Sequence, residues 1–450
     1  MVTTQNKPPS TSRRWVKYVV ALFVLALIVL LGLMQWRSAQ RNSTVADTAL
    51  LDQVTQYDLA HGGSKDTVQR GKYLAQAADC IACHSVQGGK DFAGGLRMAT
   101  PFGVIVSSNI TPDKEHGIGS WSEEEFIRAI KQGVAPHGKL LYPAMPYNLY
   151  AVISDQDIKD IFAYLKSIPP VPEAAPPTQL PFPFNIRQLM FGWNLLFFNP
   201  SPFKPDSAKS VQWNRGAYLV DGVGHCAACH SGKNLLGANN DYLLGNDLEG
   251  WHAPELSGNT YLGIGSWNVQ ETVNYLHNGG NRSSVAAGSM GEVVSNSTQY
   301  LNQDDLKAIA VYLKSLPGSG QTAPAPLAQT DQTMLLGHQL FQVNCAACHA
   351  SNGQGVDAMV ASLANSPGAQ APGANNLIRA ILLGGRGAAT QTNPTSAQMP
   401  AFAWKLSDVD AAAIATYVRN TWGNAASAVS DKDVASLRTK LGAAPLLVHR

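Results

Sequence analysis

Charge is scarce in this 450-residue sequence: 14% of the residues are charged, where about a quarter is usual. The 33 basic and 31 acidic residues nearly balance, giving a formal net charge of +2. No basic excess is available to bind nucleic acid. The hydrophobic fraction of 45% is ordinary for a packed protein and excludes a disordered chain. The length predicts two to four domains.

Long apolar runs are also scarce, and the single one, 18–36, lies near the N-terminus. As a helix it would be about 28 Å long, close to the hydrocarbon thickness of a bilayer. Trp15 and Trp36 flank it, as aromatic residues do at membrane interfaces. Basic residues before the run favour a cytoplasmic N-terminus: Arg13, Arg14 and Lys17. We therefore expect one uncleaved transmembrane helix in the inner membrane, with everything after residue 37 in the periplasm.

The alternative for this run is a cleaved signal peptide. Such a leader has a shorter apolar region, followed closely by a cleavage site of small residues. Here Trp36 and Arg37 stand where small residues would be needed. The length of the run and these two bulky side chains favour the retained helix.

Three similar units follow the apolar run. They begin with Arg70-Gly-Lys-Tyr-Leu, Arg215-Gly-Ala-Tyr-Leu and Leu336-Gly-His-Gln-Leu-Phe. Each unit closes on a segment with an N-cap residue, apolar residues at helical spacing and a basic residue near its end, over 154–169, 302–317 and 407–419. The alternation typical of strands is nearly absent, so each unit is expected to be a small helical domain.

These units and their connections predict the domain organisation. The cytoplasmic tip and anchor occupy 1–37, a spacer 38–64, domain one 65–168, a Pro/aromatic-rich linker 169–209, domain two 210–316, a flexible linker 317–330, domain three 331–422 and a tail 423–450. Within the first linker, 182–198 carries many large apolar residues that cannot be left in water. It is either a strap packed over the adjacent domains or a surface that docks a partner subunit or the membrane face.

All six cysteines fall in three Cys-x-x-Cys-His motifs, at Cys80, Cys83 and His84, at Cys226, Cys229 and His230, and at Cys345, Cys348 and His349. Structural disulfides would suit an exported protein, but paired cysteines at this spacing are usually redox-active or metal-binding. A zinc site needs four ligands and each motif supplies three. A thioredoxin-type motif has no use for the histidine.

Covalent haem attachment explains every part of the motif. Two thiols form thioethers to the porphyrin, and the adjacent histidine binds the iron from the proximal side. The sequence therefore predicts three covalently bound haem c groups. The predicted fold class is mainly α, with a single N-terminal transmembrane helix followed by three tandem class I-like cytochrome c domains.

Each unit also offers a methionine as a distal iron ligand, before its closing helix. Met145, Met290 and Met399 follow the proximal histidines by 61, 60 and 50 residues. A lone methionine is more often core filler, but proline follows Met145 and Met399, and the position recurs in each unit. A filled sixth position gives a low-spin iron that shuttles electrons and performs no substrate chemistry.

Two units share the sequence Gly-Ile-Gly-Ser-Trp, which ends at Trp121 and at Trp267. These tryptophans either pack on haem, or donate an indole N–H to a propionate, or belong to the ordinary core. The sequence leaves these interpretations open.

The chain resembles the three-haem cytochrome c subunits of membrane-bound dehydrogenases from acetic acid bacteria and related proteobacteria. The resemblance covers about residues 65–422. Besides the three motifs, it rests on Ser108-Asn-Ile-Thr-Pro-Asp113, Tyr142-Pro-Ala-Met-Pro-Tyr147, the linker at 182–198 and Ser297-Thr-Gln-Tyr-Leu301.

The resemblance implies a function in a respiratory chain. The subunit would take electrons from a periplasmic catalytic subunit that oxidises alcohols, aldehydes or sugar acids, and pass them to ubiquinone in the membrane. The retained N-terminal helix is similar to that of cytochrome subunits paired with molybdenum-cofactor aldehyde dehydrogenases. That partner is therefore favoured over quinoprotein alcohol and flavoprotein sugar dehydrogenases, and a small additional subunit is a further candidate partner.

Two other functions stay open. An electron-entry subunit of a terminal oxidase also combines one anchor with tandem haem domains. A multihaem peroxidase would need one five-coordinate iron, and unit two, where Met290 lacks the following proline, is where that iron would lie.

Overall fold

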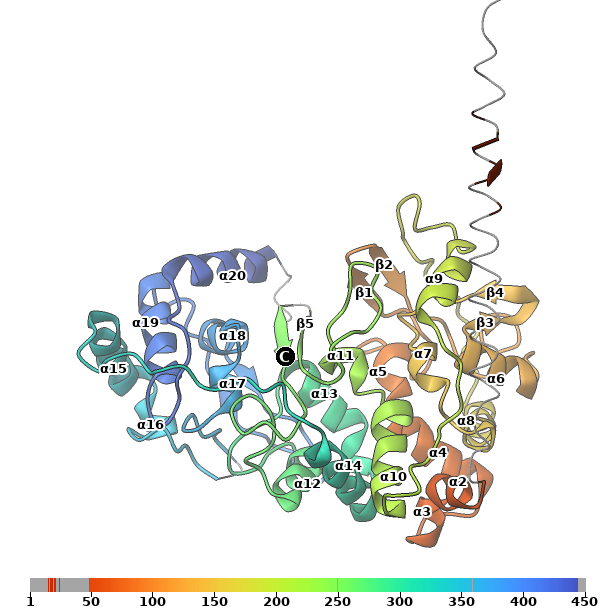
Figure 1. Cartoon of the computed structure of the whole chain (residues 1–450), viewed down its shortest axis with the longest axis horizontal. Coiled ribbons are helices and arrows are strands. Elements are labelled where there is room, and N and C mark those ends of the chain that lie inside the picture. The colour runs from red at the N-terminus through yellow and green to blue at the C-terminus, as the bar shows by residue number, and fades with distance from the viewer. Residues whose placement is uncertain are drawn as a thin grey trace, which may run out of the picture. The chain divides into compact units, whose positions relative to one another are not determined.

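The computed structural model describes residues 15, 17, 18, 20, 21, 24, 48–248, 250–357 and 359–443. The chain forms two compact units, Met1–Thr48 and Ala49–Arg450. The features described below lie in the second unit, whose labelled elements are drawn in Figure 1. They are mainly helices joined by long loops.

The expected fold class is wrong in its N-terminal transmembrane helix. Among the described residues, no helix is both long and apolar enough to cross a membrane. A span needs about 20 consecutive apolar residues in one helix, because each backbone polar group must be satisfied internally. Most of the run 18–36 lies outside the described residues, and those described within it are Tyr18, Val20, Ala21 and Val24.

Repeat one runs from α4 (Thr67–Ala77) to α8 (Asp155–Ser167). Asp66 and Ser154 cap these helices, because the side chain of each accepts a hydrogen bond from a backbone N–H of the first turn. Two short helices precede the repeat. The other elements here are α2 (Thr48–Thr55), α3 (Tyr57–Ala60), α5 (Cys80–His84), β1 (Arg97–Thr100), β2 (Gly103–Val106), α6 (Glu123–Gln132), β3 (Val134–Ala135), η1 (Pro136–Gly138), β4 (Lys139–Leu140) and α7 (Tyr147–Tyr150).

Repeat two runs from α10 (Val211–Tyr218) to α14 (Gln303–Ser315). Ser210 and Asn302 are its equivalent cap residues. The helix α9 (Leu189–Phe197) lies in the linker before it. The other elements are the π-helix η2 (Leu219–Val223), α11 (Ala227–His230), β5 (Asn246–Leu248), β6 (Trp251–Ala253), α12 (Val269–Asn278), α13 (Gly288–Asn296) and η3 (Thr298–Tyr300).

Repeat three runs from α15 (Gln332–Asn344) to α19 (Asp408–Arg419), capped by Asp331 and Ser407. A final helix packs on α19. The other elements are α16 (Ala346–His349), α17 (Pro367–Gln370), α18 (Asn375–Leu383), β7 (Gly385–Arg386), β8 (Gln398–Met399) and the final helix α20 (Asp431–Ala443).

The described strands are two to four residues long and form four separate antiparallel hairpins. Each pairs two strands that are consecutive in the chain, so no larger sheet forms among the described residues. The paired positions include Arg97 with Val106, Val134 with Leu140, Asn246 with Ala253 and Gly385 with Met399.

The first and last helices of each repeat cross at a glycine. Gly337 of α15 lies so close to α19 that a Cβ there would stand 2.6 Å from Cβ of Tyr417 and overlap the carbonyl oxygen of Ala413. A residue without a side chain is therefore required for the two helices to approach this closely. The same arrangement recurs, with 2.7 Å between the equivalent atoms at Gly216 and Tyr312 and 3.0 Å at Gly71 and Tyr164.

Repeats one and two share one hydrophobic core. It joins Leu74 and Ile158 of repeat one to Leu219 and Leu306 of repeat two, all buried. Repeat three packs around a second core that includes Phe341, Ile414 and Leu437. The first two repeats therefore form one folding unit, and the third has apolar packing of its own.

The linker segment 182–198 has one buried face. Trp193 and Phe198 pack edge-on against Tyr147, with ring centroids 6.2 and 5.3 Å apart. The indole of Trp193 donates a hydrogen bond of 2.9 Å to the carbonyl oxygen of Leu236 in repeat two. This face is a strap over repeats one and two. Its other face stays exposed, at Phe182, Leu189, Phe191 and Leu196.

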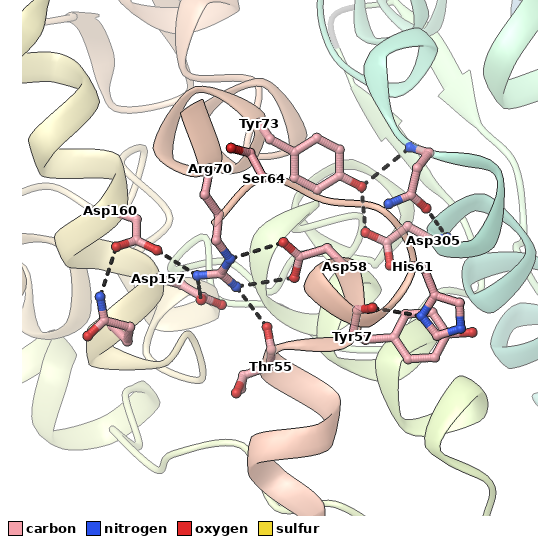
Figure 2. A network of polar contacts seen from close by, with 12 residues as sticks. Thr55, Tyr57, Asp58, His61, Ser64, Arg70, Tyr73, Asp157, Asp160 and Asp305 are labelled. Carbon is pink, nitrogen blue, oxygen red and sulfur yellow. Dashed lines mark hydrogen bonds and ion pairs between the residues drawn. The ribbon is translucent and has the colours of Figure 1, made fainter. Parts of the chain in front are cut away.

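A buried network of charged side chains joins repeats one and two. Figure 2 shows Arg70 with Asp58 on one side and the α8 carboxylates on the other. Arg70 Nη1 lies 2.7 Å from Asp157 Oδ1 and 2.6 Å from Asp160 Oδ2, and Arg70 Nε lies 3.0 Å from Asp58 Oδ2. All four side chains are at most 5% exposed.

Arg215 of repeat two enters the same network from α10. Its Nη2 reaches Asp58 Oδ1 at 3.4 Å, and its Nε and Nη2 bind Asp305 of α14 at 2.8 and 2.9 Å. The hydroxyl of Tyr73 donates to the same Asp305 at 2.5 Å. Asp58 therefore bridges the arginines of two repeats. Repeat three has Leu336 at the corresponding place before its glycine.

Candidate haem-attachment sites

Each Cys-x-x-Cys-His motif lies on one short helical turn that follows the first helix of its repeat: α5, α11 and α16 (Figure 1). Residues three and four apart on a helix share a face. The spacing therefore places the first cysteine of each motif on the same face as the second cysteine and as the histidine. All six thiols are free, and in each motif the first cysteine is half-buried and the second exposed, at Cys80 and Cys83, Cys226 and Cys229, and Cys345 and Cys348.

The histidine of each motif is held by one ring nitrogen. Nδ1 lies 2.6 Å from the carbonyl oxygen of Ser108 for His84, 2.7 Å from that of Pro254 for His230 and 3.2 Å from that of Ala361 for His349. A carbonyl oxygen only accepts, so Nδ1 carries the proton and Nε2 is left with a lone pair. This is the tautomer that ligates a metal through Nε2.

Burial lowers the pKa of all three motif histidines, which keeps them neutral. A neutral imidazole is the form that binds iron. Burial also raises the pKa of the Cys80 and Cys226 thiols to about 12, and that of Cys345 to about 11. Redox-active Cys-x-x-Cys pairs have a lowered thiol pKa, so these thiols do not suit a thioredoxin-type role.

The described residues also contain no group of three or more His, Cys, Asp or Glu side chains placed to hold a metal ion. The three motifs are thus not gathered into a zinc site. Each repeat keeps its own set of two sulfurs and one imidazole, which is the set that attaches haem c.

Repeat two contains an orphaned donor that fits such a group. The indole Nε1 of Trp267 is buried and has no hydrogen-bond partner among the described protein atoms. Asn246 Nδ2, in the same repeat, is buried and unpartnered in the same way. Buried polar groups are nearly always paired, and a haem propionate is an acceptor of the kind these two N–H groups lack.

The three candidate distal methionines lie in different local structures. Met145 sits in a tight turn before α7, where its carbonyl oxygen accepts from Tyr147 N at 2.7 Å. Met399 ends β8, opposite Gly385. Met290 instead lies inside α13, half-buried beside a small cluster of Ala286, Val294 and Ala388. Each methionine belongs to the same repeat as its histidine, and axial ligation by all three stays a prediction.

Sequence reasoning missed the residues that join repeats one and two. The arginines had a visible signal, because Arg70 and Arg215 precede the glycine in two lead-ins and Leu336 replaces them in the third. Tyr150 had none. Its hydroxyl contacts Ala78 and His225, which are 72 and 75 residues away in the chain.

The comparisons with known proteins agree with this geometry. The cytochrome c family model matches residues 68–169 and 335–422, which hold the first and third motifs. Helical repeats that each carry a Cys-x-x-Cys-His set define a c-type cytochrome, with covalently bound haem c as its cofactor.

The relatives define the family further. The chain is 42% identical over 395 residues to the gluconate 2-dehydrogenase cytochrome c subunit of Pantoea cypripedii, covering 82% of this chain and 89% of the relative. It is 38% identical to the fructose dehydrogenase cytochrome subunit of Gluconobacter japonicus, covering 83% of each. It is 35% identical to the cytochrome c subunit of the quinone alcohol dehydrogenase of Gluconobacter oxydans (strain 621H), covering 85% of each. This chain belongs to that family of dehydrogenase cytochrome c subunits.

Proposed function

We propose that the protein is a three-haem electron relay, which takes electrons from a dehydrogenase catalytic subunit and passes them to ubiquinone. The observation that carries this proposal is the threefold repetition of a motif histidine fixed through Nδ1 by a backbone carbonyl. Bound haem would supply reversible one-electron chemistry at each site.

The residues of this chain then act by holding and shielding the iron. His84, His230 and His349 would bind it from the proximal side through Nε2. Met145, Met290 and Met399 would fill the distal position, which raises the reduction potential and excludes other ligands. Trp267 and Asn246 would bind a propionate in repeat two.

The catalytic partner is proposed from the names of the relatives, which are subunits of gluconate, fructose and alcohol dehydrogenases. We take the partner to be a periplasmic dehydrogenase of an alcohol, aldehyde or sugar acid. A molybdenum-cofactor aldehyde dehydrogenase and a quinoprotein alcohol dehydrogenase are both candidates, with a small third subunit as a further candidate. We also propose that the haem-bearing unit lies in the periplasm, since the basic residues before the apolar run are typical of an exported chain.

One experiment tests the relay directly. The complex is purified from membranes, its largest companion is identified, and reduction of the haems by the companion's substrate is followed by their reoxidation with ubiquinone. Reduction by substrate and reoxidation by quinone support the relay. Copurification with a copper-haem oxidase would favour the oxidase alternative.

One specific observation favours a second candidate, a peroxidase. Met290 lies in a helix, whereas Met145 and Met399 lie in a turn and a short strand. An open iron in repeat two would bind carbon monoxide in the reduced protein and turn over hydrogen peroxide. If the intact protein neither binds carbon monoxide nor turns over hydrogen peroxide, the peroxidase is excluded and the relay is the remaining function.

A further inference from the structure

Two of the three haem-attachment motifs adjoin one another. Helix α5, which carries the first motif, contacts α13 of repeat two, and α7 of repeat one contacts η2, which leads into the second motif. The residue before each motif's first cysteine has left-handed backbone, at Asp79 (φ 47°) and His225 (φ 38°). Residues other than glycine rarely adopt this conformation, so surrounding contacts must hold it.

Tyr150 contacts the segment before each of the two motifs, through the backbone of Ala78 before the first and the side chain of His225 before the second. Its hydroxyl donates to the carbonyl oxygen of Ala78 at 3.2 Å and lies 3.4 Å from Nδ1 of His225. Its ring packs edge-on against the His225 imidazole, with centroids 5.3 Å apart. Ala78 precedes Cys80 by two residues, and His225 precedes Cys226 directly. One side chain therefore spans the gap between the two attachment segments.

The environment of Tyr150 fixes its role as a hydrogen-bond donor. The residue is 7% exposed, and burial, followed by the nearby Cys80 and Cys83 thiols, raises the pKa of its phenol well above the ordinary value. The hydroxyl thus keeps its single proton and donates it in the hydrogen bond to the carbonyl oxygen of Ala78. His225 Nδ1 must then donate toward the Tyr150 oxygen and the carbonyl oxygen of Val223, 3.3 Å away.

Other contacts also join repeats one and two near the segments that precede their motifs. The hydroxyl of Ser297, at the end of α13 in repeat two, donates to the carbonyl oxygen of Ala77 at 3.3 Å. The hydrophobic core shared by repeats one and two surrounds Tyr150, Leu74 and Val223. The described attachment segment of repeat three, by contrast, packs with its own core through Cys345 and Ala346.

We propose that Tyr150 is a positioning residue that holds haem sites one and two as a closely coupled pair, separate from site three. The pair deepens the proposed relay and requires haem at these two motifs. Haem bound at these two motifs would supply one-electron exchange between them, in which the electron lost at one site is gained at the other without a proton or a further reagent. Electrons entering the pair would equilibrate within it before they move to or from site three.

The test uses the purified full-length protein with its haems attached. Two haems held close together give a split circular-dichroism signal in the Soret band, and their midpoint potentials depend on each other. We expect both signatures in the native protein. In Tyr150→Leu both should be lost at unchanged haem content. Tyr150→Phe keeps the ring contact with His225 and should retain the split signal at reduced amplitude.

Tyr73→Phe is the matched control, since Tyr73 also joins repeats one and two but bonds Asp305 instead of an attachment segment. It should leave the split signal unchanged. An unsplit native signal, an unaltered Tyr150→Leu protein or an equal loss in Tyr73→Phe would each overturn the proposal. If Tyr150→Leu does not fold, an unchanged split signal in Tyr150→Phe would overturn the proposal.

These measurements need no dehydrogenase and no quinone. A relay that fails with its proposed partner therefore leaves the haem pair untouched. Equally, if the relay works but the native protein shows no coupling between haems, only the proposal of a haem pair is refuted.

Discussion

Arg215 and Asp305 form an ion pair that has no solvent exposure, with Nε and Oδ1 2.8 Å apart. Both side chains come from the two helices that cross in repeat two. Because Arg215 also reaches Asp58, the pair belongs to the contact between repeats as much as to the core of one repeat.

We expect Arg215→Leu to destabilise the protein by about 3–5 kcal/mol, because removing one partner leaves buried carboxylates uncompensated. The midpoint of unfolding by guanidinium, measured on the haem-loaded protein, gives the loss. The control is Lys90→Ala, which removes an exposed ion pair with Glu173 and should cost at most about 1 kcal/mol. Equal losses in the two variants would contradict the buried network.

Gly337→Ala should also destabilise the protein, by roughly 1–3 kcal/mol or more, since the added methyl group meets Tyr417 and the Ala413 carbonyl. Gly192→Ala is the matched control inside α9, where nothing lies within 4 Å of the new Cβ. Alanine gains up to about 1 kcal/mol over glycine in a helix. Thermal unfolding should therefore shift in opposite directions, and a neutral Gly337→Ala would show that the crossing is loose.

His349→Ala should remove the proximal ligand of site three and leave sites one and two intact. We expect the low-spin absorbance of the native-state protein to fall by about a third per chain, and the pyridine haemochrome assay to show whether haem stays attached at all three motifs. His338→Ala is the control, because His338 lies on α15 with its ring tilted against that of Tyr417, outside the attachment motif. A spectrum unchanged in His349→Ala would exclude the histidine as a ligand.

Asp221 predicts a stability change with pH. Burial raises the pKa of this carboxyl to about 6, although the hydroxyls of Tyr242 and Tyr312 donate to it. The folded state then binds more protons than the unfolded state between about pH 4 and pH 6. The contribution of Asp221 to the free energy of unfolding is therefore present at low pH and lost as pH rises through 6.

Unfolding curves of Asp221→Asn, compared with the native protein from pH 4.5 to 7.5, check this sign. The variant should gain stability relative to the native protein as pH rises through 6. Asp433→Asn is the control and should show no such trend in this range, because hydrogen bonds from Ser430 lower the pKa of Asp433 and its contribution is lost only as pH falls below about 4. A difference between Asp221→Asn and the native protein that does not vary with pH would contradict the shift.

The local pattern of the sequence was enough to predict the closing helices of the repeats. Ser154 and Ser407 each cap the closing helix that they indicated, because capping is decided within one turn. The apolar run at 18–36 misled, since hydrophobicity alone does not establish a continuous spanning helix.

Contacts between repeats could not be derived from local pattern. In the sequence, Tyr150 resembles any tyrosine near a helix. Its role depends on its contacts with Ala78 and His225, which only the fold brings close to it. The linker showed the same limit. Its apolar composition allowed a strap or a docking surface, and only the packing of Trp193 against Tyr147 shows which face is covered.

The division of the core between repeats decides where the chain can be cleaved without unfolding the fragments. Proteolysis at 317–330 would cut an exposed stretch between the two large apolar cores, and each fragment would retain its own large core, while the small cluster of Ala286, Val294 and Ala388 would be divided between them. Excision of repeat one together with α2 and α3 would instead expose Leu219 and Leu306 and leave Arg215 without its ion pair to Asp58. The first two repeats are therefore expected to fold and unfold together.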